Sequence, residues 1–465
     1  MTDFVSLLLP DRDQKARPIH LVDEASFEAW LKKRPADDRR LLEALRFDGK
    51  SPHAFAILPR GGDFEVVTAV KSVDTLSPWC LAKLGESLPE GTYRLAHGEP
   101  GIAALGWLLA QHEFDSYRSK KEGPERGPRV LLTGEAAKID LTVRLAQATA
   151  LVRDLVNTPA ADLGPAELEQ AVRDAANELG AQVRVTSGEE LKEGYPLIAA
   201  VGGAASKERV PRLIELEWGK ADDPRVAIVG KGVCFDSGGL DIKSAAGMRI
   251  MKKDMGGAAH ALALARLVIG EKLPVHLHLL IPAVENAVSG TAYRPGDIVK
   301  ARKGMFVEID NTDAEGRLIL ADALAKAVED KPELIVDFAT LTGAARVALG
   351  PDLPAFFANE EALASSAAEA SKEVDDPLWR LPIWPAYDEM LKSDVADFAN
   401  AANSPMAGCI VAAMFLKKFV PDEISWAHLD TYAWRDQAKP GRPKGGDALG
   451  LRAMFVALKS RYLQE

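Results

Sequence analysis

The segment RVAIVGKGVCFDSGGLDIK, residues 225–243, begins with branched apolar residues and ends in a stretch rich in glycine and charge. Branched apolar residues in a short run are typical of a buried strand. Glycine, aspartate and serine together favour a turn. A helical pattern, MGGAAHALALARLVIG, follows at 255–270. The segment therefore predicts a strand that leads through a charged loop to a helix.

The same alternation continues on both sides of this segment. Further strand patterns are QVRVT (182–186), VHLHLLIPAV (275–284) and LIVDFAT (334–340), and a helical pattern, RLILADALAKAVED, occupies 317–330. This order predicts an α/β fold with a mixed, largely parallel sheet flanked by helices. In such sheets, ligands bind at the carboxyl ends of the strands, where the charged clusters of this chain fall.

The first part of the chain has an α/β pattern of its own. It contains strand patterns FAILP (55–59) and FEVVTAV (64–70) and a helical pattern GIAALGWLLAQHEF (101–114). RSKKEGPERGPR (118–129) carries charge, glycine and proline without apolar periodicity, which predicts a linker. We expect an N-terminal α/β domain at 1–128, with an oligomerisation or regulatory role, and a larger catalytic α/β domain at 129–465.

Composition excludes several classes of protein. The 465 residues are 47% hydrophobic and carry a net charge of −11, which disfavours a chain that wraps nucleic-acid phosphates. The 3 cysteines form no disulfide pattern, as expected in the reducing cytoplasm. The start, MTDFVSLLLPDRDQ, does not resemble a signal peptide, and no run approaches the ~20 apolar residues of a membrane span. We expect a soluble cytoplasmic protein without a membrane partner.

Three charged clusters follow strand patterns and precede helical ones. They comprise Lys231, Asp236 and Lys243, then Asp254, and then Asp313, Glu315 and Arg317 within NTDAEGRL. Each cluster alone is also compatible with a surface turn or a helix start. Together they place four carboxylates that would repel one another unless cations compensate. Two divalent ions would cancel these charges and could activate a water molecule. Neighbouring glycines, such as Gly316, would make room for the close approach.

Other catalytic chemistries have weaker support. His260 lies along an apolar helical pattern, which indicates packing, and His276 and His278 lack a metalloprotease spacing such as HExxH. The serine in FDSGG does not fit GxSxG. Cys234 lies between apolar neighbours, as a buried thiol does.

Four segments together resemble the leucyl aminopeptidase (cytosol aminopeptidase) family of two-metal exopeptidases. They are VGKGVCFDSGGLDIK (229–243), MKKDMGGAA (251–259), NTDAEGRL (311–318) and DFATLTGA (337–344). NTDAEGRL is the signature of that family, and the segments occur in the family's order and spacing. The resemblance extends from about residue 140 to the end of the chain and includes WAHLD (426–430) and GRPKGG (441–446).

The resemblance implies a role for each matched residue. Asp236 and Glu315 would bridge two metal ions, Lys231 and Asp254 would complete one coordination shell, and Asp313 would complete the other. Lys243 would stabilise the developing oxyanion and contact the substrate. Arg317 would hold a bicarbonate ion as general base, since its planar fork matches a planar anion. Met251, Thr340 and the Leu341 backbone would border the pocket for the first side chain, although Met251 and Leu341 are equally compatible with core packing.

The implied activity is release of the N-terminal residue, with a preference for leucine or other apolar residues, from peptides with a free N-terminus. The ligand types fit Zn²⁺, Mn²⁺, Co²⁺ or Mg²⁺. The resemblance also implies a homohexamer. Asp241 and the pair Lys252–Lys253 depart from the common family pattern and add charge beside the site.

Two alternative functions share part of this evidence. A DNA-binding or architectural protein with peptidase activity would need a continuous basic surface, but the basic segment KKRPADDRR (32–40) is interleaved with acids. A two-metal phosphohydrolase would use the same carboxylates on phosphate esters.

Overall fold

The computed structural model describes residues 2–119 and 127–463, which fold into two compact units. Residues 1–150 and 437–444 form the first unit, and residues 151–436 and 445–465 form the second. Residues 129–150 thus belong to the first unit, although the sequence predicts a domain break after residue 128. The reason is that strand β6 (Arg129–Thr133) pairs with β1 (Leu8–Pro10) and β5 (Gly91–Leu95). Residues 120–126 of the expected linker lie outside the described residues.

The first unit is built on a sheet with the strand order β1-β6-β5-β2-β4-β3. Its remaining strands and its helices are β2 (Arg17–Val22), β3 (Phe55–Arg60), β4 (Asp63–Ala69), α1 (Phe27–Lys32), α2 (Ala36–Ala44), α3 (Ala82–Ser87), α4 (Ala103–Leu109), the 3-10 helices η1 (Phe4–Leu7) and η2 (Ala136–Lys138), and the start of α5 (Ile139–Asn157). Only β3 runs antiparallel to its neighbour among the pairs described in this sheet. The strands predicted at 55–59 and 64–70 are confirmed. The predicted helix at 101–114 is shorter, spanning Ala103–Leu109, and the side-chain amide of Gln111 beyond its end exchanges hydrogen bonds with the backbone of Arg129 at the start of β6.

The second unit contains a larger mixed sheet with the order β16-β15-β18-β14-β9-β11-β8-β7, and β10 pairs with the end of β11. The strands are β7 (Gln182–Ser187), β8 (Arg212–Trp218), β9 (Arg225–Gly230), β10 (Gly232–Asp236), β11 (His276–Asn286), β14 (Leu334–Ala339), β15 (Ala355–Ala358), β16 (Trp379–Arg380) and β18 (Ser425–Asp430). Strands β18, β14, β9 and β11 are parallel neighbours. The fold class predicted from the alternating pattern is therefore confirmed.

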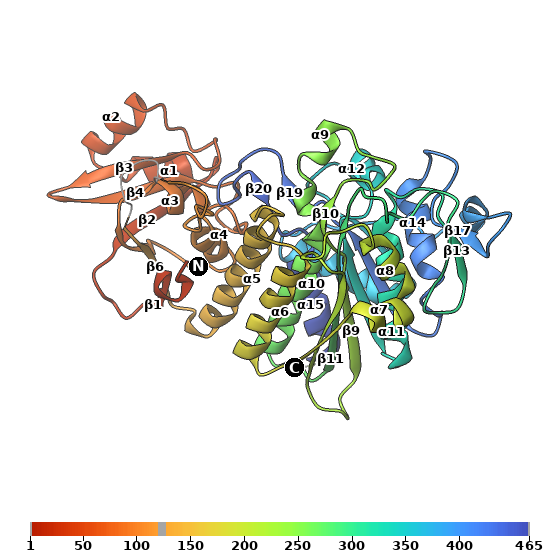
Figure 1. The fold of residues 1–465 in the computed structure, drawn as a ribbon. Coiled ribbons are helices and arrows are strands. Elements are labelled where there is room, and N and C mark those ends of the chain that lie inside the picture. The colour runs from red at the N-terminus through yellow and green to blue at the C-terminus, as the bar shows by residue number, and fades with distance from the viewer. Residues whose placement is uncertain (1, 120–126, 464–465) are drawn as a thin grey trace. The chain divides into compact units, whose positions relative to one another are not determined.

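Helices cover both faces of this sheet (Figure 1). One face carries α6 (Pro165–Leu179), α10 (Gly256–Gly270) and α15 (Leu451–Tyr462), with α13 (Glu361–Glu373) packed on α15. The other face carries α7 (Gly188–Gly194), α8 (Pro196–Gly202), α11 (Glu315–Glu329) and α14 (Gly408–Lys417), which share a core cluster with the sheet. Because both faces are buried, Ile228 and Val229 of β9 are each 0% exposed.

The parallel strands bring their carboxyl ends to one edge of the sheet. Lys231 follows β9, Thr340 follows β14 and Asp430 ends β18. The loop that contains Asp313 comes from elsewhere, because it follows a strand of a separate small sheet, β12-β13-β17. That sheet consists of β12 (Ile298–Lys300), β13 (Phe306–Glu308) and β17 (Phe398–Ala399). The site is therefore assembled from one edge of the main sheet and one loop beside it.

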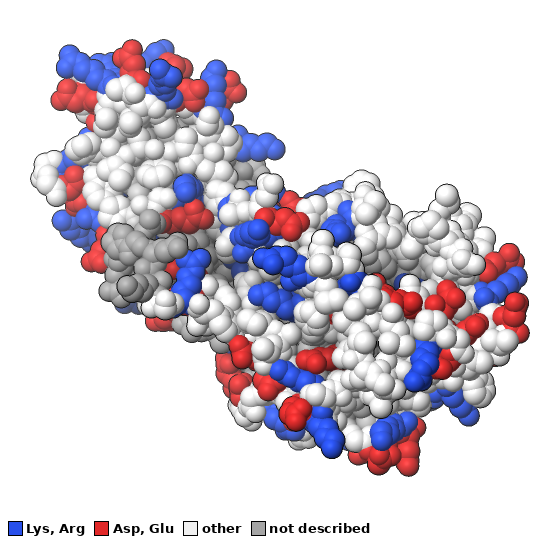
Figure 2. Space-filling model, turned by 45° about the horizontal axis from the view of Figure 1, so that its top comes forward, with Lys and Arg blue, Asp and Glu red and all other residues white. Residues whose placement is uncertain are grey.

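The surface carries both signs of charge. Acidic and basic side chains are interspersed over the face seen in Figure 2. Within the basic segment 32–40, Arg34 contacts Asp38 at 3.1 Å and Arg40 lies 3.7 Å from Asp37. No helix among the described residues is long and apolar enough to cross a membrane.

Candidate active site

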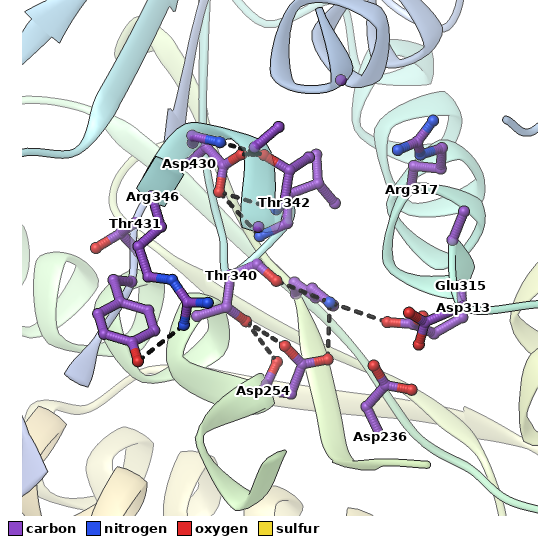
Figure 3. Close-up of a pocket in the computed structure, with 18 of the residues that line it drawn as sticks. Asp236, Asp254, Asp313, Glu315, Arg317, Thr340, Thr342, Arg346, Asp430 and Thr431 are labelled. Atoms are coloured by element: carbon purple, nitrogen blue, oxygen red, sulfur yellow. Dashed lines mark hydrogen bonds and ion pairs between the residues drawn. The ribbon is translucent and has the colours of Figure 1, made fainter. Parts of the chain in front are cut away.

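A cavity of about 410 Å³ opens where the charged loops meet (Figure 3). All of the residues assigned to the site from the sequence line it, namely Lys231, Asp236, Lys243, Met251, Asp254, Asp313, Glu315, Arg317, Thr340 and Leu341. Residues that are more than 100 positions apart in the chain are in direct contact here. For example, the Nζ atom of Lys231 donates a hydrogen bond to the carbonyl of Thr340 at 2.9 Å.

The backbone of Lys231 is held by two neighbouring elements. Its N–H donates to the carbonyl of Phe338 in β14 at 3.0 Å, and its carbonyl accepts from the N–H of Ala258 in α10 at 2.8 Å. Gly316 makes room for its side chain, because a Cβ at that position would lie 2.4 Å from the Lys231 Cε atom. Gly316 thus permits the close approach of the Lys231 side chain to α11.

Asp236 and Asp254 are held by neutral donors. Asp236 ends β10, and the Asn286 amide donates to its Oδ1 at 2.9 Å. Asp254 lies in the 3-10 helix η3 (Met251–Met255), and the hydroxyl of Thr340 donates to its Oδ1 at 2.8 Å. Both carboxylates are 2% exposed, so these hydrogen bonds fix their orientation away from bulk water.

The loop before α11 carries Asp313 and Glu315, and the helix begins at Glu315 itself. The preceding residue in the turn, Thr312, donates its N–H to the Asp241 carboxylate at 2.7 Å and its hydroxyl to the carbonyl of Gly238 at 2.7 Å. Gly238 has a φ of 89°, which favours glycine at this turn. Asp241, a departure from the family pattern, thus joins the two carboxylate-bearing loops.

Two lysines lie among the carboxylates. The Nζ atom of Lys231 lies 2.7 Å from Asp254 Oδ2 and 2.9 Å from Glu315 Oε1. The Nζ atom of Lys243 lies 2.7 Å from Asp236 Oδ2 and also contacts Asp313. Four carboxylates therefore face two ammonium groups, which leaves an excess of negative charge within this cluster.

The pKa values reflect this crowding. Burial and the nearby Asp236 raise the pKa of both Glu315 and Asp313, because each ionised form is poorly solvated and faces another anion. Burial opposes the charged form of Lys231, but Asp254 and Glu315 outweigh it and raise the lysine pKa. Lys231 would therefore have to exchange its proton for a metal ion in order to act as a ligand.

The donor set suits a metal ion. Oxygen atoms of Asp236, Asp313 and Glu315 lie within 4.8 Å of one another. Glu315 Oε2 is buried and has no hydrogen-bond partner among the described residues. A buried carboxylate oxygen without a donor is costly, and a divalent cation would satisfy it.

Arg317 lies two residues beyond Glu315 in α11 and is 9% exposed. Its Nη1 donates to the carbonyl of Asn400 at 2.7 Å, whereas its Nε is buried without a hydrogen-bond partner within the described chain. Burial lowers the pKa of Arg317 to about 10, so the guanidinium stays charged at neutral pH. An unsatisfied buried donor on a cation is a suitable contact for an anion.

Several lining residues were not assigned to the site from the sequence. They include Lys253, Thr342, Arg346, Asp430 and Tyr432. Lys253, Thr342 and Asp430 lie within the matched segments MKKDMGGAA, DFATLTGA and WAHLD, whereas Arg346 and Tyr432 lie outside every matched segment and have no distinguishing local pattern. Asp430 accepts hydrogen bonds from the N–H groups of Leu341 and Thr342 and from the Thr342 hydroxyl.

The residues considered for other chemistries have structural roles. His260 is 0% exposed, with Nδ1 2.7 Å from the carbonyl of Gly256 and Nε2 accepting from the N–H of Leu449. Ser237 donates its hydroxyl to the carbonyl of Asn286 at 2.7 Å. Burial raises the pKa of the Cys234 thiol, which keeps it protonated.

Comparison with known proteins agrees with this site. The family described as "Cytosol aminopeptidase family, catalytic domain" matches residues 150–455, and "M17 aminopeptidase, N-terminal domain" matches residues 17–126. A relative from Roseiflexus castenholzii named "Probable cytosol aminopeptidase" is 41% identical over 91% of this chain and 93% of its own. One of the same name from Syntrophotalea carbinolica is 41% identical over 77% of this chain and 74% of its own.

Solved structures show the same likeness. The crystal structure of the cytosol aminopeptidase from Coxiella burnetii superposes with a TM-score of 0.92 at 44% identity, covering 98% of this chain and 99% of that one. The bottromycin maturation enzyme BotP, in complex with Mn, superposes with a TM-score of 0.86 at 30% identity, covering 98% of this chain and 100% of that one. The chain belongs to the cytosol aminopeptidase family and is therefore a metal-dependent aminopeptidase that acts on peptides.

Proposed function

We propose that this aminopeptidase holds two divalent metal ions among the charged loops and removes leucine and other apolar residues from peptide N-termini. The observation that carries the proposal is the carboxylate cluster of Asp236, Asp313 and Glu315, whose oxygens lie within 4.8 Å of one another. Asp236 and Glu315 would bridge the ions. Lys231 and Asp254 would complete one shell, and Asp313 would complete the other.

Each ion, when bound, would lower the pKa of a water molecule and polarise the peptide carbonyl. Lys243 supports the reaction with its own charge, because its contacts with Asp236 and Asp313 hold the ammonium at the cavity wall. Burial opposes that charge, but Asp236 outweighs it and raises the pKa of Lys243. The ammonium is therefore placed to donate to a carbonyl oxygen that gains negative charge.

Arg317 would bind a bicarbonate ion as general base. Arginine cannot accept a proton at neutral pH, so a bound base would supply what the lining side chains do not. The buried Nε of Arg317, which lacks a partner among the described residues, supports this assignment.

The apolar part of the cavity supports the preference for leucine. Met251 and Leu341 line it, beside Thr340. Leu341 also packs against the hydrophobic core of the second unit, and this packing restricts the position of its side chain. An apolar pocket separates similar side chains only modestly, and we expect a broad specificity within the apolar residues.

Metal identity, location and assembly are proposals of the same kind. Zn²⁺ and Mn²⁺ are our first candidates, with Mg²⁺ and Co²⁺ as alternatives, and the manganese bound to BotP supports Mn²⁺. The names of the relatives support a cytoplasmic location. A homohexamer, which family likeness suggests, can be tested by light scattering.

The decisive experiment combines crystallography with an assay. Anomalous diffraction from metal-soaked crystals should give two peaks a few Å apart between Asp236 and Glu315. Leucyl p-nitroanilide should be hydrolysed, hydrolysis should stop on chelation, and added Zn²⁺ or Mn²⁺ should restore it. A single peak, or no peak at these residues, would disprove the two-metal site, and turnover of phosphate esters in place of peptides would favour a phosphohydrolase.

A further inference from the structure

One wall of the active-site cavity carries two cations that the proposed metal chemistry does not use. Lys253 in η3 and Arg346 in α12 (Gly343–Leu349) both contact Tyr432, and all three line the cavity. The Lys253 Nζ lies 5.2 Å from the Tyr432 ring centroid and the Arg346 Cζ lies 4.9 Å from it. Arg346 Nη1 also donates to the tyrosine hydroxyl at 3.0 Å. We call these three residues the basic wall.

The charges of the basic wall are not matched by acids in contact with them. Within residues 2–119 and 127–463, the nearest carboxylate oxygen to Lys253 Nζ is Asp254 Oδ1 at 3.9 Å. That carboxylate is already engaged, since it accepts from Thr340 and pairs with Lys231. Arg346 has no ion pair within 4.0 Å in the same part of the chain.

Asp430, the one acid in the described cavity lining that lies outside the four-carboxylate cluster, has other hydrogen-bond partners. Both of its oxygens accept hydrogen bonds from Leu341 and Thr342 at the start of α12. This carboxylate therefore stabilises a helix end and does not reach across to pair with Lys253 or Arg346. Lys253 is 5% exposed and its nearest carboxylate is already engaged, which is an unusual arrangement because burial of a poorly compensated charge is costly. Arg346 is exposed and adds a second positive charge beside it. A negatively charged ligand would relieve that cost.

The basic wall is separate from the carboxylate cluster. In Figure 3, Arg346 lies to one side of Asp254, whereas Asp313 and Glu315 lie to the other side. Both features line the same cavity, so a substrate whose first peptide bond lies at the carboxylate cluster has room to extend toward the basic wall.

We propose that the basic wall binds a carboxylate of the substrate. This carboxylate is either the acidic side chain of the first residue or the terminal carboxylate of a short peptide. The guanidinium of Arg346 and the ammonium of Lys253 offer N–H donors that suit a carboxylate, and Tyr432 holds both cations in place. The inference rests on the function proposed above and adds a second class of substrate to the apolar one.

Matched substrate pairs test the two sources of the carboxylate. The first pair is glutamyl and glutaminyl p-nitroanilide, and the second is Leu-Gly and Leu-Gly-amide, with leucyl p-nitroanilide as reference. In one pair the carboxylate-bearing member should have a kcat/KM about tenfold or more higher, since a hydrogen bond to a charged group discriminates by about that factor. The difference should appear chiefly in KM and should shrink in high salt.

Variants of the metal-loaded protein test the residues. Lys253→Met and Arg346→Gln should each bring the ratio within the responding pair close to one. Lys252→Met is the matched control, because Lys252 donates to the carbonyl of Asn157 and does not line the cavity. It should keep the full ratio. Arg346 is exposed on a short helix, so Arg346→Gln decides the question if Lys253→Met fails to fold or to retain metal.

The outcomes are distinct. A preference in the first pair assigns the wall to an acidic side chain, and one in the second pair assigns it to a terminal carboxylate. Equal rates within both pairs, or a preference that survives both substitutions, would overturn the inference while leucyl p-nitroanilide still turns over. Absence of turnover with every unblocked substrate would instead refute the proposed function.

Discussion

The hydroxyl of Thr312 joins the two loops that carry the proposed metal ligands, and Thr312→Val removes it with little change in shape. Thr312 is 0% exposed. Its hydroxyl donates to the carbonyl of Gly238 at 2.7 Å and accepts from the N–H of Asp241 at 2.9 Å. The substitution leaves the buried carbonyl of Gly238 without this donor. The N–H of Asp241 also loses its acceptor, but Asp241 is exposed, so water can accept that hydrogen bond instead.

The size of the effect follows from these two groups. A buried polar group without a partner costs about 1–3 kcal/mol, and a hydrated one costs much less. We therefore expect Thr312→Val to lower the free energy of unfolding by about 2 kcal/mol, which is a few degrees in Tm for a unit of this size. Because the loops hold Asp236 and Asp313, the affinity for metal should also fall, by about 10- to 100-fold.

Thermal unfolding of chelated protein, followed by calorimetry, measures the first effect, and metal titration measures the second. Thr312→Ser is the control, since it keeps the hydroxyl and loses only a methyl group. The reasoning is refuted if the valine variant binds metal as tightly as the parent protein, or if the serine variant loses as much stability as the valine variant.

Three further predictions test the site and the core. Arg317→Ala should slow turnover without emptying the metal sites, whereas Glu315→Ala should empty them, and elemental analysis of dialysed protein beside kcat separates the two results. Asp447→Ala should destabilise the second unit by about 3–5 kcal/mol in chemical unfolding, because it removes the buried carboxylate that pairs with Arg153 and Arg435, of which Arg435 keeps a second ion pair with Asp352; a loss below 1 kcal/mol would contradict this. For His278, burial opposes protonation, but hydrogen bonds to two carboxylates raise its pKa to about 9 from 6.5, so its charge stabilises the folded state fully below about pH 6.5 and ceases to do so as pH rises through 9. The stability difference between the parent protein and His278→Gln should therefore shrink, by up to about 3 kcal/mol, between pH 6.5 and 9, and a difference that grows with pH would contradict the assignment.

Local sequence determined the order of elements in the second unit. The runs at 225–230 and 334–340 became β9 and β14, and the pattern at 317–330 became α11. These elements were predictable because hydrophobic periodicity reports which faces are buried, and both faces of this sheet are covered. Lys231, Thr340 and Asp430 could be expected to lie near one another, because they lie at the carboxyl ends of the parallel neighbours β9, β14 and β18.

Tertiary structure decided the features that depend on contacts between distant residues. Residues 129–150 have helix and strand patterns that suit either domain, and only the pairing of β6 with β1 and β5 places them in the first unit. The strand before NTDAEGRL looks like any other short strand, yet it belongs to a separate sheet, because its partners are β12 and β17.

The same distinction applies within the site. Lys231, Asp236, Asp313 and Glu315, which we propose as metal ligands, could be selected from the sequence because metal ligation restricts residue type and spacing. The basic wall could not, since Lys253, Arg346 and Tyr432 are common residues, and only packing brings the buried Lys253 and the exposed Arg346 onto the same tyrosine ring. These contacts join residues that are 86 or more positions apart, such as Arg346 and Tyr432. A local sequence pattern contains no information about such contacts or about burial.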